Sequence, residues 1–109
     1  MDARFLPYNG PRLRTPDQRA NGIGPRVAER RAHLELTQDG LCGQIAYETK
    51  GQWTPSWADI SRLEHGARLV SDLEVVVLAA VLKCSAGWLL LGEGVVLDRE
   101  KPGGMDGQN

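Results

Sequence analysis

Apolar residues recur with a helical period in five segments of the chain, and polar residues and glycines separate these segments. The first segment, residues 25–36, opens with Pro25, which suits a first helical turn. The second, residues 38–50, follows Thr37, a good N-cap, and places apolar side chains at positions 41, 42, 45 and 46. Both segments are predicted to be helices. Two glycines inside the second each cost about 1 kcal/mol relative to alanine, so this helix is expected to depend on its neighbours.

The third segment, "SWADISRLEHGAR" at residues 56–68, has two possible starts. Either Thr54 caps a helix that begins at Pro55, or Ser56 is the cap and Asp59 follows it three residues later. In both cases the pattern turns Ile60 and Leu63 inward, and Gly66 is predicted to end the helix in a left-handed conformation.

The fourth and fifth segments complete an all-α pattern. Ser71 and Glu74 have the spacing of a capping box, which favours a helix over residues 71–83 where the run of valines alone would indicate a strand. Apolar residues surround most of this helix, so it is expected to be the central and most buried one. Ser85 begins a short last helix that ends near Gly92. The predicted core consists of Leu41, Ile45, Ile60, Leu63, Val77, Val81 and Trp88.

The chain divides into three parts. Residues 1–22 contain prolines and glycines without a sustained period, and are predicted to form an irregular N-terminal arm outside the core. Residues 23–92 form the helical domain, and residues 93–109 are polar and glycine-rich, which predicts a flexible C-terminal tail.

Composition and motifs exclude several classes of function. Apolar residues make up 41% of the chain and charged residues 25%, as in globular proteins, and the longest apolar run is too short to cross a membrane. No basic and then apolar leader opens the sequence, so a cytoplasmic protein is expected. Cys42 and Cys84 belong to no metal or redox spacing, which predicts two buried, reduced thiols and no cofactor. No nucleophile, base and orienting group share a spacing, and the histidines, His33 and His65, are isolated, so we expect no enzyme.

The charge is unevenly distributed. Residues 1–35 carry seven arginines against four acids, a net charge of +3, whereas residues 36–70 carry −1 and residues 71–109 carry −3. The first third of the chain is therefore the part best suited to face phosphate.

Three pieces in this order, "LTQ" before the second helix, "ISRLEHG" at the end of the third and "SDLEVVVLAAVLKCSAGWLL", resemble the Cro and phage-repressor (Xre-like) helix-turn-helix family over residues 23–92. The resemblance implies a five-helix lambda-repressor-like domain whose third helix enters the major groove of double-stranded DNA. Carried over by position, Trp57, Ala58, Ser61 and Arg62 face the groove. Arg62 is the candidate for reading guanine, with a solvated surface arginine as the alternative.

The same resemblance assigns the backbone contacts. Gln38 matches a glutamine that touches a phosphate, although it also suits a polar first turn, and His65 and Arg68 would approach the backbone after the third helix. Arg31 and Glu64 match a structural pair that joins the first and third helices, so Glu64→Ala is expected to loosen the domain rather than act through DNA.

The sequence departs from the family pattern in two places. The connection between the second and third helices is lengthened by "AYETKGQWTP", which includes Trp53. Trp57 occupies a position that the family gives to small or polar residues. It can press on a thymine methyl group or a sugar, or pack against Trp53 or Tyr47, and we favour packing because large rings contribute most when buried.

Two classes of function remain open. The first is a sequence-specific transcriptional regulator, most simply a repressor, that binds a two-fold symmetric operator as a homodimer. The third helix carries little net charge, so phosphate contacts must come from elsewhere. The candidates are arm arginines, with a disordered tail of scattered arginines as the alternative: Arg4, Arg12, Arg14 and Arg19. The dimer surface is expected at the fifth helix and Val95–Leu97, which can equally cover the domain's own core. The second class is a protein-interaction module, such as an antitoxin, that binds a protein partner through Trp53, Trp57 and the long connection.

Overall fold

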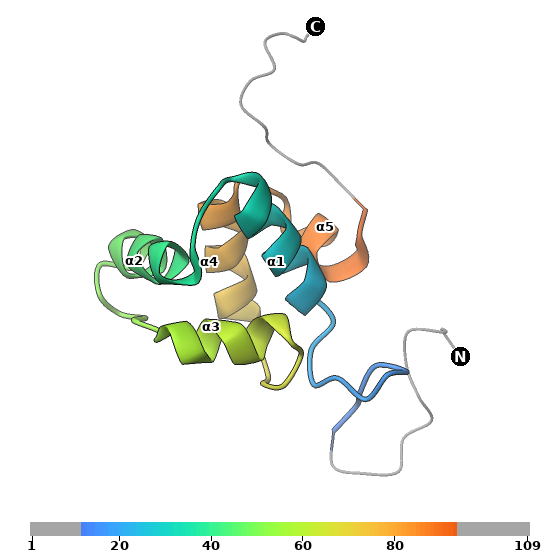
Figure 1. Cartoon of the computed structure of the whole chain (residues 1–109). Coiled ribbons are helices and arrows are strands. Elements are labelled where there is room, and N and C mark those ends of the chain that lie inside the picture. The colour runs from blue at the N-terminus through green and yellow to red at the C-terminus, as the bar shows by residue number, and fades with distance from the viewer. Residues whose placement is uncertain (1–11, 94–109) are drawn as a thin grey trace, which may run out of the picture.

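Five helices make up the fold of the computed structural model, which describes residues 12–93 (Figure 1). In chain order they are α1 (Gly24–His33), α2 (Gln38–Glu48), α3 (Trp57–Glu64), α4 (Asp72–Leu82) and α5 (Ala86–Leu91). The all-α prediction is confirmed, and each helix lies within one of the predicted segments or starts one residue before it. Arg4 and Val95–Leu97 lie outside the described residues. Within the described residues, no helix is long and apolar enough to cross a membrane.

Side chains at the helix ends decide where the helices begin. Thr37 Oγ1 accepts a hydrogen bond from the Gly40 amide at 2.9 Å, and Ser71 and Glu74 form both hydrogen bonds of a capping box. For α3 the Ser56 alternative is correct, because Ser56 Oγ accepts from the Asp59 amide at 3.1 Å. Gly66 follows α3 with a φ of 76°, a left-handed conformation that glycine adopts without strain.

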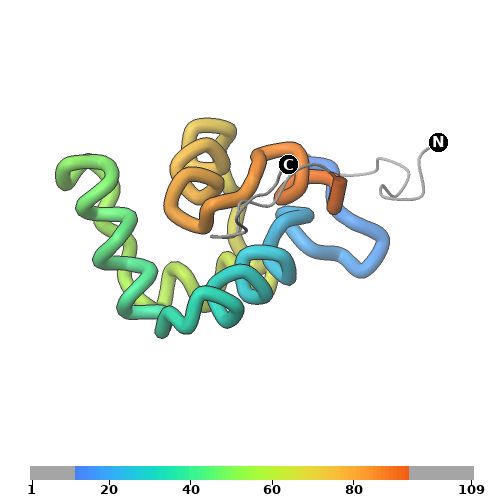
Figure 2. The backbone as a smooth tube through the Cα atoms, turned by 90° about the horizontal axis from the view of Figure 1, so that it is seen from above, coloured from blue at the N-terminus to red at the C-terminus, as the bar shows by residue number. Residues whose placement is uncertain are grey.

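The core lies where α4 packs against α1, α2 and α5, and α3 closes it by packing on α1 and α2 (Figures 1 and 2). Five of the seven predicted core residues are buried, whereas Val77 and Trp88 are only partly buried and pack at the edge of the core. Helix α4 turns Leu78 and Leu82 inward instead of Val77, and α5 inserts Leu89 where Trp88 was predicted. The prediction for Val77 and Trp88 was therefore wrong: in each case the next residue in the helix is the buried one.

Helix α4 is central, but it is not buried on all sides. Leu73 is 75% exposed and Val76 is 61% exposed, and both lie on the face that points away from α1, α2 and α5. The prediction that this helix is the central and most buried one is confirmed, because α4 has more buried residues than any other helix of residues 12–93. One apolar face of α4 is left open.

The last residues of the predicted arm are part of the fold. Thr15 to Arg19 form a turn, in which the Gln18 amide donates to the Thr15 carbonyl at 2.9 Å and Pro16 supplies the fixed φ of a second turn position. The Ala20 amide then donates to the Gly66 carbonyl at 2.7 Å, which joins this segment to the end of α3. The turn and the segment after it therefore lie beside α3 (Figure 1).

Candidate nucleic-acid interface

Helix α3 is fixed to the domain through Glu64, whose side chain is 5% exposed. Arg31 Nε donates to Glu64 Oε2 at 2.6 Å, and Arg31 Nη2 donates to Glu64 Oε1 at 3.1 Å. The carboxylate raises the pKa of Arg31, chiefly through these hydrogen bonds. Arg31 also donates to the Leu36 carbonyl at 2.9 Å, so one guanidinium holds α1, the α1–α2 turn and α3 together. This is the contact that the sequence predicted for the pair.

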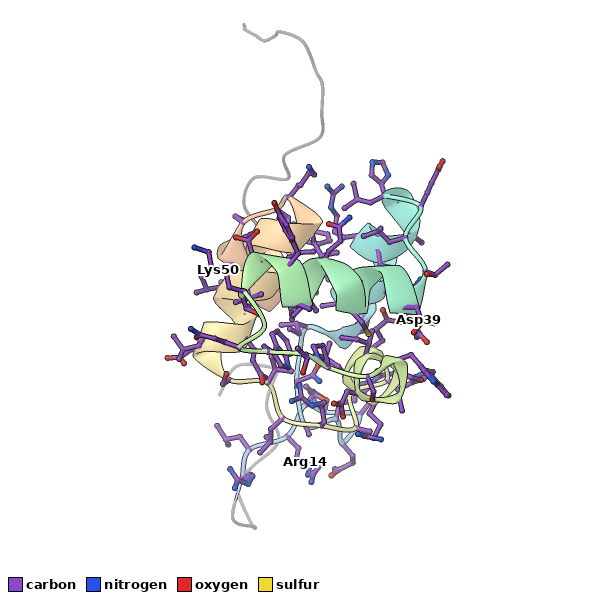
Figure 3. All side chains as sticks on the ribbon, turned by 90° about the vertical axis from the view of Figure 1, so that its left-hand side faces the viewer. Arg14, Asp39 and Lys50 are labelled. Carbon is purple, nitrogen blue, oxygen red and sulfur yellow. The ribbon has the colours of Figure 1, made fainter. Side chains whose placement is uncertain are left out.

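Gln38 belongs to the same cluster. Its Nε2 donates to Glu64 Oε1 at 3.1 Å, which places the amide between the start of α2 and the end of α3. The side chain thus has a structural partner, and Asp39 is exposed beside it at the same helix end (Figure 3). An anion that approaches this end of α2 meets both the positive end of the helix dipole and the negative charge of Asp39.

The opposite side of α3 is open to solvent. Trp57, the first residue of the helix, is 60% exposed, and Arg62 is also exposed. Ala58 and Ser61 lie between them and are half-buried. The predicted packing of Trp57 is wrong, because Trp53 takes the partly buried position against the core and Tyr47 is 87% exposed.

Arg62 is paired within its own helix. Its Nη2 donates to Asp59 Oδ1, one helical turn earlier, and both side chains are solvent-accessible. Such an exposed pair contributes little to stability. It does restrict the guanidinium, which has five N–H donors and uses one of them here.

His65 and Arg68 follow the helix. The Nδ1 atom of His65 lies 2.8 Å from the Ser61 carbonyl oxygen, and the ring is exposed. Arg68 donates to both carboxylate oxygens of Glu74 at 3.3 and 3.4 Å, so its charge is already balanced by α4. Of the two, His65 is the side chain left on the surface.

The N-terminal segment before the turn supplies two cations that have no carboxylate partner among residues 12–93. Arg12 and Arg14 are exposed, and the hydrogen bond that the structure shows for Arg14 goes to the Gln18 carbonyl at 3.4 Å. Arg19 instead pairs with Asp17 at 2.8 Å. Arg14 lies at the lower end of the domain in Figure 3, beyond α3.

The long connection from α2 to α3 is folded rather than extended from the surface. Thr49 Oγ1 accepts from the Trp53 amide at 3.0 Å and donates to the Ile45 carbonyl at 2.9 Å, while Lys50 and Gly51 turn the chain with positive φ. Pro55 is buried, and α2 and α3 pack directly on one another. The extra residues therefore form a compact turn that leaves the α2–α3 contact in place.

The two thiols differ in burial. Cys84 is buried as predicted, whereas Cys42 is only half-buried, which corrects the prediction for that residue. Burial raises the pKa of both thiols, and for Cys42 the nearby Asp39 carboxylate raises it further. Within residues 12–93, no three His, Cys, Asp or Glu side chains gather closely enough to hold a metal ion.

Sequence reasoning missed Asn21, which organises the start of α1. Its Oδ1 accepts from the amides of Ile23 and Gly24 at 3.1 and 2.9 Å, and its Nδ2 donates to the carbonyls of Leu63 and Arg68 at 3.1 and 2.9 Å. An asparagine shortly before a first-turn proline is a capping signal that can be read from the sequence. The contact to the end of α3, 42 residues away, has no such local signal.

No protein-family model matches this chain, and neither does any curated protein.

Proposed function

We propose that this protein is a sequence-specific DNA-binding transcriptional regulator, most simply a repressor, that acts in the cytoplasm as a homodimer on a two-fold symmetric operator. The observation that carries the proposal is the two-sided character of α3. One side is fixed by Ile60, Leu63 and Glu64, and the other presents Trp57 and Arg62 to solvent. A rigid helix with an exposed reading side is the geometry by which a helix-turn-helix domain meets the major groove.

Arg62 is the proposed reader of guanine. Two parallel N–H groups of a guanidinium match the O6 and N7 atoms of guanine, and such a pair discriminates by about 1–3 kcal/mol. The hydrogen bond to Asp59 uses one of the two N–H groups of Nη2, and the other remains to form a parallel pair with a neighbouring N–H group at a base. Asp59 then acts as a positioning residue. Its hydrogen bond restricts the rotamers of Arg62 in the free protein, so less conformational entropy is lost when the guanidinium binds a base.

Trp57 is the second proposed base contact. Its ring stands at the first position of α3, and the N-terminal residues of a recognition helix lie nearest the base edges. An exposed indole there can cover the methyl group of a thymine, which is an apolar feature of the major groove. Ala58 and Ser61 lie on the same side and are short enough to permit close approach.

Phosphate contacts are proposed for the N-terminal turn and for the edges of α3. Arg12 and Arg14 are exposed in the segment that the Ala20–Gly66 hydrogen bond joins to the end of α3, and His65 is exposed after that helix. Gln38 and Arg68 would contribute by position, although each already has a carboxylate partner in Glu64 and Glu74. We therefore expect the larger share of phosphate neutralisation from Arg12 and Arg14.

The experiment is selection of bound duplexes from a random DNA pool, at low and at physiological salt. Wild type and Arg62→Ala are compared with Lys50→Ala, since Lys50 is also an exposed cation but lies at the other end of α2 from Asp39 (Figure 3). We expect a two-fold symmetric motif that persists for wild type and Lys50→Ala at physiological salt and that is lost or relaxed for Arg62→Ala. Failure to enrich any sequence at either salt would overturn the proposal.

The second candidate function is a protein-interaction module, and the exposed Trp57 favours it. Tryptophan is enriched among the residues that dominate protein interfaces, and this one is 60% exposed in the free chain. Trp53 contributes less to such a surface because it packs partly against the core. Loss of a partner protein on Trp57→Ala but not on Arg62→Ala would support this function over DNA reading.

A further inference from the structure

We propose that the exposed side of α4 is a self-association surface, on which α4 of a second copy of this chain packs in the antiparallel direction. The proposal goes beyond DNA reading and does not rest on it. It follows from a line of exposed apolar residues along α4 and from the opposite charges at the two ends of that line. It also follows from the small size of Ala80, which leaves room for Val76 of the second copy.

The apolar line consists of Leu73, Val76 and Ala80, which are all exposed. At about 100° per residue these three positions fall on one side of a helix, opposite the buried Val75, Leu78 and Leu82. Tyr47 of α2 is 87% exposed and borders the same side, where a groove of about 520 Å³ lies between α2 and α4. An exposed line of this kind, with an aromatic side chain beside it, is typical of an interaction surface.

Opposite charges mark the two ends of the line. Asp72 is the first residue of α4, and Lys83 follows its last residue and lines the groove beside Ala80. Both side chains are exposed, and among residues 12–93 no ion pair involves either of them. They are eleven positions apart, about three helical turns, so they share one edge of the exposed side.

This arrangement selects a second copy as the occupant and fixes its direction. When two such helices pack face to face in the antiparallel direction around a two-fold axis, Asp72 of each lies against Lys83 of the other. Parallel packing around a two-fold axis would instead place like charges at the same end of the pair and would bring no Asp72 near a Lys83. The two-fold axis passes between the two helices, midway between Asp72 and Lys83. Val76 of one copy therefore lies close to Ala80 of the other, and the small alanine leaves room for the valine.

The direction also determines where α3 lies in the pair. Helix α4 begins near α3 and runs away from it (Figures 1 and 3). Antiparallel pairing therefore places the two α3 helices at opposite ends of the assembly. This contact differs from the one that would hold two α3 helices on neighbouring half-sites, for which the exposed Leu90 and Leu91 of α5 are available. The apolar line is shorter than a standard interface, so we expect a weak dimer with a dissociation constant in the micromolar range or above.

The test is sedimentation equilibrium of the full chain without DNA, over a range of concentrations and at low salt. Wild type is compared with Asp72→Lys, with Lys83→Asp and with the double variant that exchanges the two charges. Lys83 has a φ of 58°, and aspartate is among the residues that tolerate this conformation. We expect each single variant to weaken association on the order of tenfold, because two attractive contacts become repulsive, and the double variant to restore it.

Two further variants separate this surface from others. Val76→Lys should abolish association without unfolding the domain, since the side chain is already exposed, whereas Leu13→Ser, at an exposed leucine of the N-terminal segment, should leave association unchanged. Thermal melting of each variant checks that the fold is retained. A wild type that stays monomeric at every concentration, a dimer that is indifferent to both single charge reversals, or a dimer lost with Leu13→Ser would each overturn the proposal.

Discussion

The Arg31–Glu64 pair offers the sharpest test of how this domain is held together. In Glu64→Ala the carboxylate is removed while the guanidinium of Arg31, only 20% exposed, stays at the contact between α1 and α3. Gln38 loses its side-chain acceptor in the same step. We expect a large loss of stability because a nearly buried cation is left without its anion.

The magnitude follows from the burial of the two groups. Breaking a buried ion pair costs about 3–5 kcal/mol when one partner is removed. Arg31 keeps some solvent contact and its hydrogen bond to the Leu36 carbonyl, so we expect the free energy of unfolding to fall by about 3 kcal/mol. For a domain of this size, 1 kcal/mol lowers the melting temperature by roughly 4–8 °C, so the expected fall is roughly 12–24 °C.

The assay is thermal and urea unfolding followed by circular dichroism, with Arg31→Met/Glu64→Leu as the matched control. Removal of both charges often costs little, so the double variant should be clearly more stable than Glu64→Ala. The raised pKa of Arg31 adds stability that is present below the unfolded-state pKa and is lost only as the pH rises through the folded-state pKa, far above neutrality. The Arg31 contribution should therefore be constant between about pH 7 and pH 9. An unchanged melting temperature for Glu64→Ala would refute this reasoning.

Three further predictions concern positions away from the pair. Asn21→Ala should destabilise the domain by about 2–3 kcal/mol in urea unfolding, because two amides and two carbonyls lose their side-chain partner, whereas Gln18→Ala should have little effect. Gly24→Ala should lower the melting temperature, since a Cβ atom would lie 2.5 Å from the Glu64 carbonyl oxygen; a wild-type value would show that α1 can shift. Mass spectrometry of alkylation at about pH 8 should find Cys84 much slower in the native chain than in urea, because burial and a raised pKa keep the thiol protonated; equal rates would contradict its burial.

Local signals allowed most of the helices to be predicted. Thr37, Ser71 and Ser85 cap their helices through their own hydroxyl groups, and these hydrogen bonds span only three residues. The helical period also identified Ile60 and Leu63 as residues that α3 buries, because this helix has a clear apolar stripe. Helix α4 lacks such a stripe, so its period did not show that Val77 lies at the edge or that Leu73 and Val76 are exposed.

The candidate site was less accessible to sequence reasoning. Whether Trp57 packs or stands free depends on what else fills the space beneath it, and Trp53 reaches that space through the turn at Thr49. The pairing of Arg68 with Glu74 depends on the angle at which α4 leaves α3. Both outcomes are set by tertiary geometry, which residue spacing does not encode.

Under the proposed function, the distribution of paired charges limits the phosphate contacts that this domain can make. Residues 12–93 contain ten basic and ten acidic side chains, so the described domain has no net positive field to attract a duplex. Arg31, Arg62 and Arg68 each pair with a carboxylate, whereas Arg12 and Arg14 are exposed and have no acidic partner among the described residues. Non-specific affinity grows with the number of phosphates neutralised, so it should be weak here and its salt dependence shallow. Under the proposed function, discrimination between sequences then depends on the base contacts of Arg62 and Trp57, because little phosphate affinity is available to hold the protein on a wrong site.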